Sequence, residues 1–100
     1  MAQLHNPHPG EILKEEFLSE IGTSQNQLAQ AIGVPGNRIH ALVNGTRSIT
    51  GDTDLRLCKF FGLSEGYFLQ LQNAYDTLEA KRRIGTQVAK IKPYRPDKAA

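Results

Sequence analysis

Residues 24–45 of the sequence, which indicate the fold and the function together, read SQNQLAQAIGVPGNRIHALVNG. Ser24, followed three residues later by Gln27, has the form of a capping box, so a helix is predicted to start here. The apolar residues spaced along one face of that helix are Leu28, Ala29 and Ile32. Gly33 can adopt the left-handed conformation that ends a helix. The segment therefore predicts a short helix that stops at Gly33.

A second short helix is predicted directly after the first. Pro35 suits a first helical turn, since its missing N–H leaves no bond unmade there, and Asn44 with Gly45 supplies a stop. The inner face of this helix consists of Ile39, Leu42 and Val43. Two short helices joined by a tight turn have the geometry that sets the second helix into the major groove of DNA. The alternative is an ordinary helical hairpin that packs and binds nothing.

The outward face of the second helix carries small and polar side chains. They are Gly36, Asn37, Arg38, His40 and Ala41, and we expect them to face the bases of DNA. Arginine can bond two acceptors on guanine and asparagine can do the same on adenine, so Asn37 and Arg38 are the expected base readers. Gly36, without a side chain, lets the backbone come close. For His40 a solvated surface histidine is the alternative.

Phosphate contacts are expected around this helix, because such contacts fix register without reading sequence. The candidates are Ser24, Gln25, Asn44, Thr46 and Arg47. The first two stand at a helix start, where free backbone N–H groups attract anions. Residues 33–51 contain Arg38 and Arg47 and no acidic residue, which favours contact with a polyanion. Simple helix termination is the alternative for Asn44, and a solvated charge is the alternative for Arg47.

The flanking sequence predicts three more helices and no strand, so the expected fold class is all-α with five helices. One helix covers residues 11–21 and stops at Gly22, another begins near Asp52 and ends at Gly62, and the last is capped by Ser64. Their expected inner residues are Ile12, Leu13, Phe17 and Ile21, then Leu55, Cys58 and Phe61, and finally Tyr67, Phe68, Leu71, Ala74, Tyr75 and Leu78. Helical spacing continues to Ile84, Val88 and Ile91, but Gly85 argues against one unbroken helix.

Length and composition fit one compact domain. The chain has 100 residues, of which 39% are apolar and 22% charged. We expect a DNA-binding domain over residues 1–92 and a flexible basic tail over residues 93–100. Residues 1–80 hold five basic and nine acidic residues, whereas residues 81–100 hold seven basic residues and one acidic residue.

No apolar run approaches the roughly 18–20 residues that span a bilayer, and residues 1–10 show no signal-peptide core. A cytoplasmic protein without membrane contact is therefore expected. The single cysteine, Cys58, lies in an apolar stretch and cannot form an internal disulfide. A buried apolar filler is the expected role, with a reactive thiol as the alternative.

A homodimer is expected, because one short helix that reads a few bases is too weak to find a site in a genome. Two copies on a two-fold axis double the contacts and require a palindromic operator in double-stranded DNA. The candidate dimer face comprises Phe68, Leu71, Tyr75, Leu78, Ile84 and Val88. The alternative is that these residues cover the core of the monomer.

Several separated motifs resemble one family in order and spacing. Those of residues 24–50 are Ser24-Gln25-Asn26-Gln27-Leu28-Ala29, Gly33-Val34-Pro35, Asn37-Arg38-Ile39, Asn44-Gly45-Thr46-Arg47 and Ile49-Thr50, and they resemble the lambda-repressor-like helix-turn-helix (XRE) regulators. Outside them, His8-Pro9-Gly10-Glu11-Ile12-Leu13, Glu15-Glu16-Phe17-Leu18, Asp52-Thr53, Leu55-Arg56-Leu57 and Leu71-Gln72-Asn73-Ala74-Tyr75-Asp76 resemble the HigA-type antitoxins, a branch also known as plasmid-maintenance antidote or virulence-associated proteins. The resemblance covers roughly residues 5–92.

This resemblance implies a five-helix fold with a C-terminal extension and a double role. The antitoxin binds a cognate toxin, a RelE-like ribosome-dependent mRNA interferase, and as a dimer it represses the operon that encodes both. Two features depart from the family pattern: Phe68-Leu69 stands where relatives often have Phe-Trp, and the C-terminal region is more basic than an antitoxin needs. The basic residues are Lys81, Arg82, Arg83, Lys90, Lys92, Arg95 and Lys98. The runner-up functions are a regulator without a toxin partner and a nucleic-acid binder led by the tail.

An enzyme is not expected, and neither is a cofactor. His5 and His8 suggest a metal site, but Pro7 and Pro9 place them in a non-helical arm and no further ligand cluster completes a set. The types of Ser24, His40 and Asp52 fit a catalytic trio, but Ser24 already has a capping role and no oxyanion-binding loop is visible. The expected acidic helix of Glu11, Glu15, Glu16 and Glu20 can attract a basic toxin, with a solvated face as the alternative.

Overall fold

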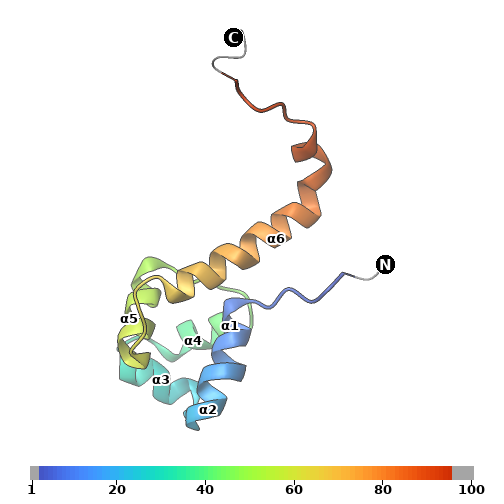
Figure 1. Cartoon of the computed structure of the whole chain (residues 1–100). Coiled ribbons are helices and arrows are strands. Elements are labelled where there is room, and N and C mark those ends of the chain that lie inside the picture. The colour runs from blue at the N-terminus through green and yellow to red at the C-terminus, as the bar shows by residue number, and fades with distance from the viewer. Residues whose placement is uncertain (1–2, 96–100) are drawn as a thin grey trace.

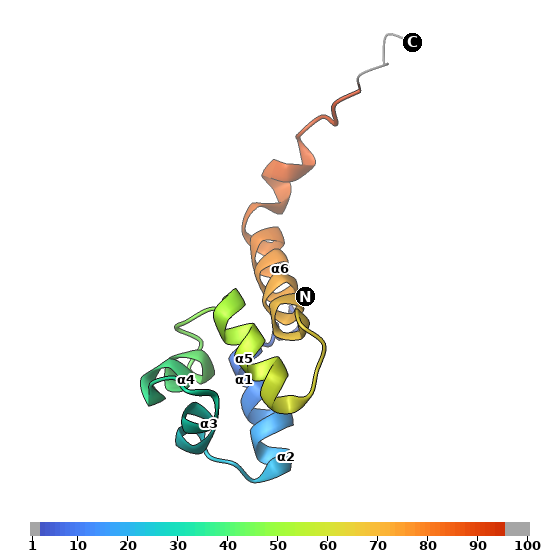
Figure 2. The ribbon, with the colours of Figure 1, turned by 90° about the vertical axis from the view of Figure 1, so that its left-hand side faces the viewer.

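The computed structural model describes residues 3–95, and within that range every regular element is a helix (Figures 1 and 2). The elements are α1 (Pro9–Ile12), η1 (Leu13–Leu18), α2 (Ser19–Ile21), α3 (Gln25–Ile32), α4 (Gly36–Val43), α5 (Gly51–Phe61) and α6 (Tyr67–Ala89). Because α1, η1 and α2 follow one another without a break, they form one rod, and the described chain consists of five helical rods. The predicted all-α class with five helices is confirmed.

The first rod contains a π-helical turn, which changes the face that it buries. In η1 the backbone N–H of Ser19 bonds the carbonyl of Lys14, five residues earlier. The wider turn brings Leu13 and Leu18, also five residues apart, onto the inner face, where both are buried. The prediction that Ile21 faces inward is wrong, because its side chain is 50% exposed. Gly22 ends the rod with a φ of 65°, as predicted.

The start of α1 packs against the end of α4 without a side chain between the two backbones. Gly10 is buried, and a Cβ atom built on it would lie 1.6 Å from the carbonyl oxygen of Leu42. It would also lie 2.9 Å from the backbone nitrogen of Val43. Only glycine permits this approach, so Gly10 fixes where α4 lies against the first rod.

His8 caps the start of α1. Its Nδ1 accepts a hydrogen bond of 3.0 Å from the backbone N–H of Gly10, and its ring packs edge-on against Tyr75 of α6 with the centroids 5.0 Å apart. Partial burial lowers the pKa of His8 below its usual 6.5, although the carboxylates of Asp76 and Glu11 oppose this shift. The neutral ring is therefore the form that the fold favours.

We expect the free energy of unfolding to fall as the pH is lowered through 6.5. Below pH 6.5 His8 takes up a proton in the unfolded chain more readily than in the folded chain. The contribution of His8 to the free energy of unfolding is therefore complete above pH 6.5 and is lost as the pH falls through the lower pKa of the folded state. Urea unfolding between pH 7.5 and 5 measures the effect. His8→Asn keeps a capping acceptor that does not titrate, so this variant should lose less stability over the same range. Equal losses in both proteins would contradict the assignment.

A single apolar core joins all five rods. Its buried members are Leu13, Leu18, Leu28, Ala29, Ile32, Val34, Ile39, Leu42, Ile49, Leu57, Cys58 and Phe68. Cys58 is a buried filler, as predicted. The expectation for Leu55 is wrong, because Leu55 is 50% exposed and Leu57 lies inside. The face of α5 that is buried is the face that meets α6, and it includes the polar residue Asp54.

Asp54 joins α5 to the start of α6. Its side chain is buried, and its carboxylate accepts hydrogen bonds from the backbone N–H groups of Gly66 at 2.7 Å, Phe68 at 2.9 Å and Leu69 at 3.1 Å. These groups belong to the beginning of α6, where a negative charge is favourable. The cap predicted at Ser64 is therefore supplied by Asp54 from another helix, and α6 begins at Tyr67.

Helix α6 packs on the body with its first half and projects away from it with its second half (Figures 1 and 2). The backbone at Ile84 is non-helical, with a φ of −124° and a ψ of 16°, so a kink interrupts the helix next to Gly85, as expected. Beyond Lys90 the described residues are not helical. Residues 96–100 of the predicted basic tail, including Lys98, lie outside the described residues.

The residues of the predicted dimer face differ in how far they are buried. Phe68 is fully buried in the core, so its assignment to a dimer face is corrected. Residues Leu71, Tyr75 and Leu78 are half-buried on the face of α6 that meets the body. The N-terminal arm contributes to this cover, since Asn6 donates a hydrogen bond of 3.0 Å to the carbonyl of Tyr75. Ile84 and Val88 are exposed.

Among the described residues, no helix combines the length and the apolar character needed to cross a membrane.

Candidate nucleic-acid interface

Helices α3 and α4 form the predicted pair of short helices. The capping box is present in full: Ser24 Oγ accepts from the backbone N–H of Gln27 at 3.1 Å, and Gln27 Oε1 accepts from that of Ser24 at 2.9 Å. Gly33 ends α3 with a φ of 74°, and Pro35 is the extended residue just before α4. Both helices bury apolar residues in the same core. The capping box and the glycine stop depend on neighbouring residues, so the sequence specifies this unit through local signals.

The part of α4 that projects furthest from the core is a narrower strip than the predicted outward face of the helix. Ile39 and Leu42 face the core and are fully buried. The helical positions opposite to them, spaced at i, i+4 and i+7, are Asn37, Ala41 and Asn44. Asn37 and Asn44 are exposed, and the small Ala41 lies between them. These three positions form the ridge that can enter a groove first.

Arg38 lies on one flank of this ridge and is held by another helix. Its Nη1 donates to Oδ1 of Asp52, the second residue of α5, over 2.8 Å, and its side chain is 24% exposed. The same oxygen accepts from Nε of Arg56 at 2.8 Å. The hydrogen bonds from Arg56 and Arg38 lower the pKa of Asp52, so the carboxylate is ionised near neutral pH. The residue pattern predicted Arg38 as a base reader but not its partner within the chain, which the structure shows to be Asp52.

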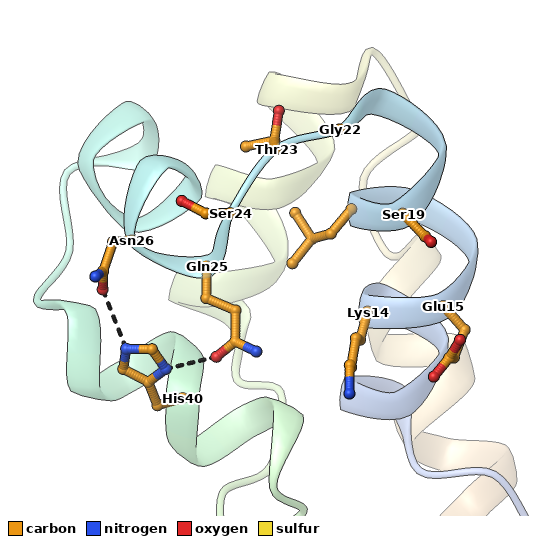
Figure 3. A pocket seen from close by; sticks show the side chains of 10 residues that line it. Lys14, Glu15, Ser19, Gly22, Thr23, Ser24, Gln25, Asn26 and His40 are labelled. Atoms are coloured by element: carbon orange, nitrogen blue, oxygen red, sulfur yellow. Dashed lines mark hydrogen bonds between the residues drawn. The ribbon is translucent and has the colours of Figure 1, made fainter.

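His40 lies on the opposite flank, beside the start of α3 (Figure 3). Its ring nitrogens are in hydrogen-bond contact with the side-chain oxygens of Gln25 and, at 3.1 Å, of Asn26. Gly36 makes room for this contact, since a Cβ atom there would lie 3.0 Å from Oδ1 of Asn26. His40 is exposed, as the surface alternative stated, yet it also fixes the side chains at the start of α3.

An open pocket of about 620 Å³ lies between the first rod and the start of α3 (Figure 3). Its lining residues are Lys14, Glu15, Leu18, Ser19, Gly22, Thr23, Ser24, Gln25, Asn26 and His40. Two of the predicted phosphate contacts, Ser24 and Gln25, are thus brought together with His40. Since Ser24 caps the N–H of Gln27, the amides of Gln25 and Asn26 are the ones that the first turn of α3 offers to an outside acceptor.

The remaining predicted phosphate contacts follow the end of α4. Asn44, Thr46 and Arg47 are all exposed. The hydroxyl of Thr46 donates a hydrogen bond of 3.2 Å to the carbonyl of Ala41, which orders the loop beside the helix end. The five candidates therefore form two groups, one at the start of α3 and the other after α4.

The three residue types considered for catalysis do not form a hydrogen-bonded chain in the described structure. Ser24 Oγ is engaged in the capping box, and the ring of His40 contacts two amide side chains. Asp52 bonds two arginines. In residues 3–95 no group of three or more His, Cys, Asp or Glu residues is arranged to hold a metal ion, and His5 instead bonds Glu11 at 2.8 Å.

Sequence reasoning missed Asn26, Arg56 and the structural role of Asp52. Asp52 and Arg56 are four residues apart on a predicted helix, and this spacing is the signal that could have revealed their ion pair. Arg56 also donates to the carbonyl of Ile32 at 2.8 Å, so it ties α5 to the end of α3. The contacts to Ile32 and Arg38 join residues far apart in the sequence, and the residue pattern alone carries no signal for them.

Comparison with known proteins places this geometry in a family. The helix-turn-helix family model HTH_3 matches residues 13–68, which include the whole of α3 and α4. Virulence-associated protein I of Dichelobacter nodosus is 45% identical over 75 residues, which cover 75% of this chain and 69% of that protein.

Solved structures of HigA proteins share the fold. The structure of Pseudomonas aeruginosa antitoxin HigA with the higBA promoter superposes with a TM-score of 0.84 at 34% identity and covers 91% of this chain and 100% of that chain. An addiction module antidote protein of the HigA family from Coxiella burnetii gives a TM-score of 0.84 at 46% identity, with coverage of 91% and 100%. These three relatives are a virulence-associated protein, an antitoxin and an antidote protein, and none of these names denotes an enzyme.

Proposed function

The chain belongs to the HTH_3 helix-turn-helix family, together with the HigA antitoxins, and from this we propose that it is an antitoxin that binds its own operator in double-stranded DNA as a homodimer. The observation that carries the proposal is the exposed polar ridge of α4, beside an open helix start, in a fold that resembles a promoter-bound HigA. In this role the protein acts in the cytoplasm and represses the operon that encodes both itself and its toxin.

The contacts divide into those that read bases and those that hold phosphates. Asn37 and Arg38 read base edges, and the small Ala41 lets the helix approach the groove floor. Gly36 and His40 lie at the edge of the same contact, where they support the start of α3. Phosphates on one side bind at Ser24 and Gln25. Those on the other side bind at Asn44, Thr46 and Arg47.

Selection of bound duplexes from a random library tests the proposal. We expect a palindrome whose half-site centres lie about 10–10.5 base pairs, or a multiple of that, apart. A selection that yields no preferred sequence would contradict specific binding. If neutralising Lys90 and Lys92 abolishes binding while α3 and α4 remain intact, the basic C-terminal region is the binding element instead.

Single substitutions separate the two kinds of contact. Asn37→Ala should weaken binding to the selected palindrome about 10- to 100-fold with little effect on a scrambled duplex, because a good base contact discriminates by about 1–3 kcal/mol. Arg47→Ala should weaken both duplexes alike and reduce the salt slope by about 1, because it removes one phosphate contact. Fluorescence anisotropy over a range of salt concentrations measures both. Equal loss of preference in the two variants would contradict the assigned roles.

We place the dimer contact on the projecting half of α6. Ile84 and Val88 are spaced at i, i+4, and they are 37% and 50% exposed. Leu71, Tyr75 and Leu78 are half-buried against the chain's own body and contribute at most an edge. Val88→Asp should weaken dimerisation more than tenfold in sedimentation equilibrium. Leu55→Asp is the matched control, since Leu55 is also 50% exposed but lies on α5. Dissociation by Leu55→Asp alone would move the interface to α5.

The cognate toxin is proposed to be a RelE-like mRNA interferase, attracted by the acidic first rod. Glu15, Glu16 and Glu20 are exposed there, and a basic nuclease would complement them. Expression of the small open reading frame beside the gene should arrest growth, and co-expression of this chain should restore growth. This chain should also co-purify with the product of that reading frame. A harmless neighbour combined with intact operator binding would make the protein a regulator without a toxin.

A further inference from the structure

A continuous set of polar contacts links the flank of α4 to the turn between α3 and α4. Arg56 donates through Nη1 to the carbonyl of Ile32 at 2.8 Å and through Nε to Asp52 at 2.8 Å. The same oxygen of Asp52 accepts from Nη1 of Arg38 at 2.8 Å. Arg38 is thus held by a carboxylate that is itself anchored to the backbone at the end of α3.

Stability does not explain this arrangement well. The side chain of Asp52 is 56% exposed and that of Arg56 is 41% exposed, so water and salt screen the ion pairs. Exposed pairs of this kind contribute little to the free energy of unfolding. The larger consequence is geometric, because a long and flexible arginine side chain is restricted to one orientation beside the exposed ridge.

The contact with Asp52 uses Nη1 of Arg38, and a guanidinium carries further N–H donors in a rigid plane. An arginine restrained at one nitrogen has fewer orientations in which it can follow a phosphate, while its remaining donors can still meet a base acceptor. Asp52 also places a negative charge next to the contact surface, where it repels any phosphate that approaches too closely.

We propose that Asp52 is a positioning residue that sets the sequence discrimination of Arg38, by holding its guanidinium beside the α4 ridge and by disfavouring phosphate contacts at that flank. The inference rests on the proposed binding of operator DNA. Without the carboxylate, Arg38 is free to bind phosphates of any sequence, whereas Arg56 keeps its hydrogen bond to the carbonyl of Ile32. Non-specific affinity then rises while the preference for the operator falls.

Asp52→Ala tests the proposal in the full-length protein, because it removes both the negative charge and the oxygen that accepts from Arg38. Affinities for the selected palindrome and for a scrambled duplex are measured over a range of salt concentrations. We expect affinity for the scrambled duplex to rise about 3- to 10-fold, its salt slope to steepen by about 1, and the ratio of specific to non-specific affinity to fall about tenfold. An unchanged ratio would overturn the proposal.

Two further variants separate positioning from charge and from folding. Glu65→Gln removes one charge from an exposed residue in the loop before α6, and it should leave the ratio unchanged. In an Arg38→Ala background, Asp52→Ala should alter the ratio much less, since the residue that Asp52 positions is gone and only the lost repulsion of phosphates remains. A fall of the ratio in Glu65→Gln, or an equal fall with and without Arg38, would overturn the proposal. If the wild-type protein shows no preference for any duplex, specific binding itself fails, which is a different result.

Discussion

Replacing Gly10 with alanine should displace helix α4 and reduce affinity for the operator more than about 100-fold. The added Cβ would have to occupy space 1.6 Å from the carbonyl oxygen and 2.3 Å from the carbonyl carbon of Leu42. These are backbone atoms, so no side-chain rotation relieves the clash and the two helices must separate. Several base and phosphate contacts would then weaken together, and each good base contact discriminates by about 1–3 kcal/mol.

The same substitution should lower the free energy of unfolding by about 3 kcal/mol or more, at the upper end of the usual cost of overpacking. Urea unfolding gives the loss of stability, and anisotropy measured where the variant is folded gives the loss of affinity. Gly51→Ala is the control for stability, because a Cβ atom there meets nothing within 4 Å and the φ of Gly51 is not positive. Native stability and native affinity in Gly10→Ala would refute the assigned role of the close contact.

Replacing Asp54 with alanine should lower the free energy of unfolding by about 3–5 kcal/mol, because the N–H groups of Gly66, Phe68 and Leu69, of which that of Phe68 is buried, lose their charged acceptor. A protein of this size typically has about 5–15 kcal/mol of stability in total, so the loss is large. The damage should begin at the start of α6, since the charge that caps this helix comes from α5. Asp54→Asn retains one acceptor oxygen and should have an intermediate effect.

Chemical denaturation measures the loss, and amide hydrogen exchange locates it. Exchange at Phe68 and Leu69 should accelerate more than exchange at Ile39 in α4, because α6 can open while α3 and α4 stay packed on the first rod. The affinity of the folded Asp54→Asn protein for DNA should remain close to that of the wild type. Stability within about 1 kcal/mol of the wild type in Asp54→Ala would show that water replaces the carboxylate.

The elements that the sequence predicts well are those with local signals. The Ser24–Gln27 capping box and the glycine stops at Gly33 and Gly62 depend on neighbouring residues only, and the structure confirms all of them. The inner face of α3 follows because a regular α-helix repeats every 3.6 residues. Ile21 was misassigned because η1 breaks this repeat, and nothing in the pattern of residues 11–21 marks the π-helical turn.

The remaining errors come from contacts between distant segments. Burial on α5 is decided by its packing against α6, so Leu57 and Asp54 are buried where periodicity favoured Leu55. The kink at Ile84 and the N-terminal arm split the apolar stripe of α6 into a covered part and an exposed part. The residue pattern of α6 gives no sign that the N-terminal arm covers it, and the pattern of α5 gives no sign that it packs against α6.

The candidate interface shows the same division. Its location on α3 and α4 follows from local signals, and Asn37 is exposed as expected. The side chain of Arg38 is held by Asp52, fourteen residues further along the chain. The side chain of His40 is held by Gln25 and Asn26 in the preceding helix. Side-chain pairing across helices is set by tertiary packing, so the residue types were foreseen but not their partners.

The narrow ridge of α4 has a consequence for how new operators arise. Asn37, Ala41 and Asn44 point outward, whereas the residues beside them are tied to α3 and α5. In the proposed binding mode, substitutions at Asn37 and Ala41 therefore change the base contacts without disturbing the scaffold, whereas a substitution at Asn44 changes a phosphate contact. Paralogues in one genome could diverge in this way to recognise different operators, and a small combinatorial library at the codons of Asn37 and Ala41 would test this.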